Sequence, residues 1–250
     1  MRYLLAIALA LFCWPVLGQI GPGPSVATPP IISAGKLVIV APRSLGSAQQ
    51  SGSGNTTTVI TTSAAINAGD VVVVFFADSS NLLTSVSGIG DGSANSYALI
   101  KKQNGGSLSN IEMWAAVNAV PLSSGTSITV THGSTVASDA NVAGAVAIAG
   151  LLRSSPTDAT NGVASTANPS LTTGTLSQAN EIVLGASVRP GTSYGGAAGF
   201  TSLFDVTVPS GTTLAADYVI VSSTASVTYT PIWSGGLIQT ATIVASLKGF

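Results

Sequence analysis

Short runs of β-branched and aromatic residues, separated by turns rich in Gly, Ser, Asn and Pro, follow one another along this chain of 250 residues. Residues 70–76 form a nearly continuous apolar run, which is typical of a central strand covered on both faces. We expect further strands at residues 37–41, 56–62, 98–102, 111–118, 127–131, 144–149, 181–188, 203–208, 213–221, 226–230 and 239–247. No window shows a sustained helical period. Many short strands at regular spacing predict an all-β fold, an antiparallel β-sandwich of the jelly-roll or Ig-like kind.

Several segments of the first half of the chain are echoed, in the same order, in the second half. The matched segments are 68–73 with 179–184, 113–117 with 217–221, 127–131 with 226–230, and 145–151 with 241–247. This order predicts an internal pseudo-twofold repeat, built either as one sandwich or as two small stacked ones. We favour the single sandwich, because the nearest candidate for a linker between the halves, residues 161–168, is short.

The N-terminus has the anatomy of a signal peptide covering residues 1–18. A positive start is followed by an uncharged, mostly apolar run at residues 3–16 and by small or compact residues before Gln19. The run is shorter than the ~20 apolar residues of a transmembrane span, so a retained anchor is the alternative reading. Cleavage would remove Cys13, the one cysteine of the chain, and would exclude disulfide bonds from the mature protein.

Residues 19–34 contain four prolines and are interpreted as an extended arm or linker before a sandwich domain at residues 35–250. We expect residues 44–55, rich in Gly, Ser and Gln, to form a surface loop. Two roles stay open for residues 36–40. They could add as a strand to the sheet edge of a neighbouring copy, or they could be the first strand of their own sandwich.

Charged residues make up 7% of the chain and hydrophobic residues 46%, with a net charge of −1. Disorder requires low hydrophobicity and high charge, so this composition argues against it. Nucleic acid is excluded as a partner because the basic residues are scattered, with 101 and 102 their one adjacent pair. A surface of Ser, Thr, Asn and Gly has little charge repulsion to keep copies apart, which favours self-association.

Candidate catalytic and metal-binding residues are few. His132 is the single histidine, cannot form a histidine cluster, and is expected at an exposed strand end. Ser193 lies in a Gly-x-Ser-x-Gly pattern, but the glycines that follow it would not open the helix of a nucleophile elbow. Asp91 and Asn95 share a Gly-rich loop that could bind calcium or form an Asx-stabilised turn, and we favour the turn. We therefore expect no enzyme activity, no cofactor and no metal.

Aromatic side chains could stack on sugar rings, and Trp114, Tyr218 and Trp233 are the candidates. Trp114 and Tyr218 are placed at equivalent positions of the two halves, inside apolar strands, which favours a role in core packing. Trp233 lies near a loop and is the best candidate for an exposed ring and a ligand contact. A lectin-like, carbohydrate-binding module is therefore the alternative functional hypothesis.

The strand and turn motifs also resemble a family. They are Ala68-Gly69-Asp70 before an apolar strand, residues 91–99, 113–116 and 128–130, Ala147-Ile148-Ala149-Gly150, and Pro156-Thr157-Asp158. Together they resemble the β-sandwich modules of secreted bacterial surface proteins and of phage or prophage tail and fibre proteins, over residues 59–250. The resemblance implies a structural or binding role and carries over no catalytic residue. We expect a secreted, cell-surface or virion-associated protein whose partners are copies of itself, other surface or virion proteins, or glycans.

Overall fold

The computed structural model describes residues 38–51, 54–79, 85–105, 109–133, 140–165, 168–191, 193–209, 211–235 and 239–250. The chain divides into the units Met1–Gly35 and Lys36–Phe250. The expected signal peptide and proline-rich arm fall in the first unit and lie outside the described residues. The described part contains strands and no helix, so the all-β prediction is confirmed. Within it, no helix is long and apolar enough to cross a membrane.

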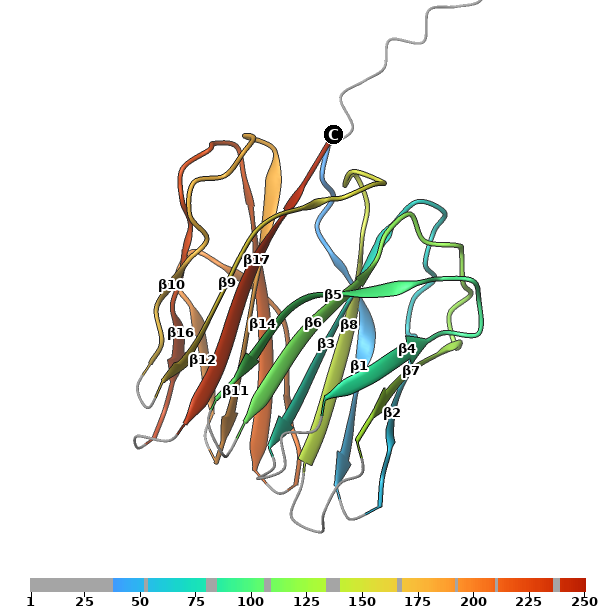
Figure 1. Cartoon of the computed structure of the whole chain (residues 1–250), viewed down its shortest axis with the longest axis vertical. Coiled ribbons are helices and arrows are strands. Elements are labelled where there is room, and N and C mark those ends of the chain that lie inside the picture. Colours follow the sequence, from blue (N-terminus) through green and yellow to red (C-terminus); the bar gives the residue numbers. More distant parts are fainter. Residues whose placement is uncertain are drawn as a thin grey trace, which may run out of the picture. The chain divides into compact units, whose positions relative to one another are not determined.

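The strands are β1 (Arg43–Ser51), β2 (Thr57–Thr61), β3 (Val71–Ser79), β4 (Val86–Gly90), β5 (Tyr97–Asn104), β6 (Asn110–Ala116), β7 (Ser127–His132), β8 (Ala140–Ile148), β9 (Thr157–Ser165), β10 (Leu171–Thr172), β11 (Glu181–Pro190), β12 (Tyr194–Ala197), β13 (Thr201–Thr207), β14 (Thr212–Val221), β15 (Thr228–Tyr229), β16 (Pro231–Trp233) and β17 (Thr240–Lys248). The first half of the chain forms a five-stranded sheet, β1-β8-β3-β6-β5, and a three-stranded sheet, β2-β7-β4. The second half forms a five-stranded sheet, β13-β14-β11-β17-β9, and the pairs β10-β15 and β12-β16. All of these ladders are antiparallel (Figure 1).

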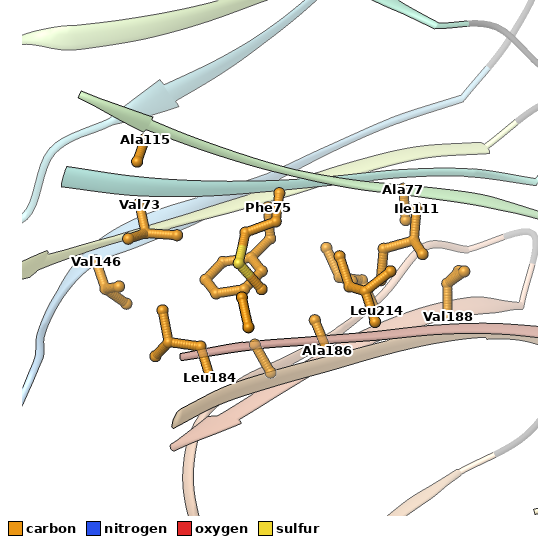
Figure 2. Packing of buried hydrophobic residues seen from close by; sticks show 14 of the residues in the cluster. Val73, Phe75, Ala77, Ile111, Ala115, Val146, Leu184, Ala186, Val188 and Leu214 are labelled. Carbon is orange, nitrogen blue, oxygen red and sulfur yellow. The ribbon is translucent and has the colours of Figure 1, made fainter. Parts of the chain in front are cut away.

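The central core lies between the two five-stranded sheets. Val73, Phe75 and Ile111 from one sheet meet Leu184 and Ala186 from the other, as Figure 2 shows. Each of these side chains is fully buried, and burial of a Val, Leu or Phe contributes about 1.5–3 kcal/mol. The other faces of both sheets are covered too. This double burial is the physical reason for the continuous apolar run of β3.

Outer layers cover the two large sheets on the sides away from the central core. Val74 and Phe76 of β3 pack against Ile60 of β2 and Ile128 of β7. In the second half, Val183 and Val244 pack with Leu171 of β10 and Tyr229 of β15. The β-sandwich is thus built as four layers, and a single two-layer sandwich is too simple a description.

The order of strands repeats between the halves. The neighbours in the first large sheet, β1-β8-β3-β6-β5, correspond one by one to β9-β17-β11-β14-β13 in the second. A bulge recurs as well, between Leu99 and Lys101 of β5 and between Ser202 and Phe204 of β13, where each strand pairs with the next one along the chain. The pseudo-twofold rotation between the halves stays a prediction.

At the level of single residues, the expected equivalence of Trp114 and Tyr218 is wrong. If residues 68–73 are aligned with residues 179–184, Val74 corresponds to Gly185. Val74 pairs with Trp114, whereas Gly185 pairs with Asp217. Because successive side chains of a strand point to opposite faces, this one-residue shift puts Tyr218 in the central core and Trp114 under the outer layer. The same ladders match Ala145 with Val244 rather than Ala241.

Two local predictions were also wrong. Residues 38–42 form no strand, although Ile39 is buried in the central core and the Val40 amide donates to the Ala149 carbonyl. The expected loop at 44–55 is largely strand β1, which pairs with β8. Residues 161–165, the start of the segment that we did not favour as a linker, belong to strand β9.

Candidate functional site

The outer layer of the first half presents a face of hydroxyl groups. On β2 and β7 the side chains alternate, with Ile60, Ile128 and Val130 buried. The residues that point outward form the cross-strand pairs Thr57–Thr131, Val59–Thr129 and Thr61–Ser127. No Asp, Glu, Lys or Arg occurs in β2, β4 or β7. We call the outward residues of these three strands the first hydroxyl face.

The outer layer of the second half has the same character. The Oγ1 atoms of Thr172 and Thr228 lie 3.2 Å apart across the β10–β15 pair, and Ser170 Oγ lies 3.2 Å from Thr230 Oγ1. Strands β10, β12, β15 and β16 contain no charged residue either. The charged residues that fall within strands therefore all belong to the two five-stranded sheets. Both outer surfaces can form hydrogen bonds without charge repulsion.

Trp233, the expected ligand contact, is 4% exposed, so the exposure predicted for its ring is wrong. Its indole Nε1 donates to Ser187 Oγ at 3.2 Å, and its ring packs on Tyr194 with centroids 5.0 Å apart. A sugar could stack on this ring only if the covering side chains moved. Trp114, as expected, is part of the packing, since its ring lies against the aliphatic cluster under the first outer layer.

A buried acid lies beneath the second outer layer. Asp217 of β14 accepts hydrogen bonds at Oδ2 from the hydroxyls of Tyr194 and of Tyr229, the latter at 2.7 Å. Burial raises the pKa of Asp217, and the two hydroxyl donors offset only part of the rise. The Oδ1 atom has no hydrogen-bond partner among the described residues. The cluster lies under Phe200, whose ring centroid is 5.0 Å from that of Tyr229.

The loop that carries Asp91 is organised as an Asx-stabilised turn. Asp91 Oδ1 accepts from the amide and hydroxyl of Ser93, at 3.1 and 2.6 Å, and Oδ2 accepts from Asn95 Nδ2 and Tyr97 OH, at 2.8 and 2.9 Å. Burial raises the pKa of Asp91, but these hydrogen bonds together bring it below its usual value. Asn95 directs its amide nitrogen, a donor, toward Asp91. A calcium site would need oxygen atoms there.

The other candidate residues have structural contacts. His132 ends β7, as expected, but the prediction that it is exposed is wrong. Its ring is buried, stacks on Phe76 and contacts Thr58 Oγ1 through Nε2 at 3.1 Å. Ser193 is followed by strand β12 instead of a helix, and it bonds through its backbone to Ser234. Within the described ranges, no three His, Cys, Asp or Glu side chains gather as metal ligands would.

One polar cluster was missed by the sequence analysis. Glu112 of β6 is 1% exposed, and its Oε1 lies 3.2 Å from Lys102 Nζ and 3.3 Å from Asn110 Nδ2. Oε1 also accepts from the Val86 amide at 3.3 Å, and Oε2 accepts from the Trp114 indole at 2.8 Å. The available signal was the alternation of Asn110, Glu112 and Trp114 on one face of an otherwise apolar strand.

Comparison of the chain with models of known families, with curated proteins and with solved structures gives no match. The resemblance to surface and phage modules therefore stays an expectation from motifs.

Proposed function

We propose that this protein is an exported structural or adhesive β-sandwich, without a catalytic role, that associates with copies of itself or with other surface or virion proteins. The observation that carries the proposal is the absence of charge from the described strands of both outer layers. Such faces carry hydroxyl groups and a few exposed apolar side chains, of which Val59 is 46% exposed. Contact between faces of this kind meets no charge repulsion.

The geometry favours contact through faces over contact through strand edges. Each outermost strand of the two large sheets, β1, β5, β9 and β13, pairs with an irregular register, whereas the ladders inside the sheets are continuous. Bulges twist an edge and discourage another strand from pairing with it. Ile39, within the segment that could have added to a neighbour, is buried in its own core.

The buried ring of Trp233 leaves the lectin-like alternative with less support, because no aromatic platform for a sugar is formed by that residue. Hydroxyl faces could still bind glycans by hydrogen bonds. A glycan array run beside the association experiment distinguishes the two functions, since the lectin-like hypothesis predicts glycan binding by a monomer.

The association experiment uses a matched pair of substitutions. Val59→Lys places a charge in the first hydroxyl face, and Val120→Lys places one at a site of similar exposure, 43%, outside it. We expect the natural protein to associate in a concentration-dependent way. Val59→Lys should weaken the affinity of association at least about tenfold, a loss of about 1.4 kcal/mol. Val120→Lys should leave the affinity unchanged. Sedimentation velocity and negative-stain microscopy give the readout. A natural protein that stays monomeric, or two variants with equal effects, would contradict self-association through the first hydroxyl face.

A further inference from the structure

The hairpin of β5 and β6 brings a lysine, an asparagine and a carboxylate together. In the β5–β6 ladder, Lys102 lies directly opposite Glu112, and Asn104 lies opposite Asn110. Asn110 is two residues from Glu112 and shares its face, so it is a diagonal neighbour of Lys102. Diagonal neighbours are about 7–8 Å apart, which a long side chain can span. Lys102 Nζ and Asn110 Nδ2 lie 3.2 and 3.3 Å from the same atom, Glu112 Oε1, so the carboxylate bridges the two side chains.

The surroundings of this trio suit a reaction between its members. Asn110 is fully buried and Glu112 is 1% exposed, whereas the Lys102 side chain is 28% exposed and also contacts the Ser85 hydroxyl. Glu112 is fixed by the Trp114 indole and the Val86 amide. Reactive groups held in place gain a large rate advantage over groups that must meet by diffusion. The exposed side of Lys102 leaves a route to water for a small product.

The fold itself does not require these residues. In the second half, the same ladder positions hold Asp205 in place of Lys102 and Ala215 in place of Glu112, where β13 pairs with β14. A buried carboxylate with a cation also carries a desolvation cost that apolar residues would avoid. The trio is thus a local feature of the first half that packing alone does not explain.

We propose that Lys102 and Asn110 form an intramolecular isopeptide bond with Glu112 as the proton carrier. Glu112 takes a proton from the Lys102 ammonium, and the neutral Nζ attacks Cγ of Asn110. Glu112 then delivers that proton to Nδ2 as the bond between Cγ and Nδ2 breaks. The new amide nitrogen releases its second proton, which leaves with the ammonia as ammonium. The balance is one amide formed, one amide bond broken and one ammonium released, with no oxidant or other reactant.

Such a bond would close the β5–β6 hairpin covalently. A cross-link stabilises a fold mainly by restricting the unfolded chain, and a short loop gains less than a long one. The proposal is independent of self-association, because it concerns contacts within one chain.

Peptide mass spectrometry of the full-length purified protein tests the bond. After denaturation, trypsin should cleave after Lys101 and, since Lys102 is blocked, release a fragment of residues 102–153 that lacks the mass of one ammonia molecule. Fragment spectra should place the link between Lys102 and Asn110. The measurement must be made on this fragment, because cyclisation of Gln19 would also remove ammonia from the whole chain.

Two variants serve as controls. Lys102→Arg keeps the charge but removes the nucleophile, and Glu112→Gln removes the proton carrier; both should give fragments of unmodified mass. If Glu112→Gln does not fold, Asn110→Ser removes the acceptor instead. Cleavage after Lys102 in the natural protein, with residues 103–153 at full mass, would overturn the proposal. A loss of ammonia that maps to Asn104, or one that is still observed in Lys102→Arg, would also overturn the proposal.

Discussion

The two halves of the molecule share a strand order. They differ in whether the large side chain beneath the outer layer comes from the large sheet or from the outer layer itself. Under the first outer layer, Val74 of the large sheet packs in one cluster with Val130 of β7. In the matched segments of the second half, the corresponding residues are Gly185 on the large sheet and Tyr229 on β15. In the second half, a large residue on the outer layer thus faces a small residue on the large sheet. The shared strand order accommodates either arrangement, provided that the volumes of the two facing residues are complementary.

The halves also differ in the direction in which the pKa of a buried aspartate is shifted. In the first, Asp91 receives hydrogen bonds at both oxygens, and its pKa is lowered in spite of burial. In the second, Asp217 has donors at one oxygen alone among the described residues, and burial raises its pKa. The same residue type is therefore stabilised as a carboxylate in one half and disfavoured as a carboxylate in the other.

Gly185→Ala should produce the largest effect, because it removes the small partner of Tyr229. A Cβ at Gly185 would lie 2.5 Å from a ring carbon of Tyr229, whose hydroxyl is held by Asp217. We expect the free energy of unfolding to fall by about 3 kcal/mol, the upper part of the usual range for overpacking. Urea denaturation measures it. Gly88→Ala in β4, where nothing lies within 4 Å of the added Cβ, is the control and should change little. Equal losses in both variants would contradict the volume argument.

Asp91→Asn should have an intermediate effect. The substitution turns one acceptor oxygen into a donor in a site whose neighbours already donate, and it should cost about 1–3 kcal/mol at neutral pH. Because the pKa of Asp91 is lowered in the folded state, its contribution is present above the unfolded value of about 3.9 and is lost as the pH falls through the folded value. The difference from the natural protein should therefore shrink in acid. A rise in melting temperature on adding calcium would contradict the Asx-turn interpretation.

The sequence predicted the strands that are buried on both faces but missed two of the four edge strands of the large sheets, β1 and β9. β3 was found because both of its faces meet cores, so residue type alone marks it. In β1, Leu45 is the one fully buried side chain, and its polar neighbours looked like a loop. β16, which carries Trp233, is three residues long and gives no period.

Side-chain environments depended on contacts that are distant in the sequence. The burial of Trp233 rests on Ser187 and Tyr194. The meeting of Lys102 with Glu112 depends on the register of a ladder that is shifted by a bulge between Leu99 and Lys101. A local pattern predicts which face a residue shares with its neighbours on one strand. It does not predict which residue of another strand it will meet.

The smallest expected effect is the pH dependence contributed by Asp217. Burial raises its folded pKa and the negative charge of exposed Asp205 adds to the rise, so Asp217 binds its proton more tightly in the folded chain. The resulting stabilisation is complete below the unfolded value of about 3.9 and is lost as the pH rises through the folded value. The stability of the natural protein relative to Asp217→Asn should therefore decline over that interval, the reverse of the Asp91 comparison. Denaturant titrations at successive pH values measure the decline, and in an Asp205→Asn background it should end at a lower pH. A flat difference would show that folding does not shift the pKa of Asp217, and a difference that grows with pH would show that Asp217 is stabilised as a carboxylate in the same way as Asp91. Either result would contradict the prediction.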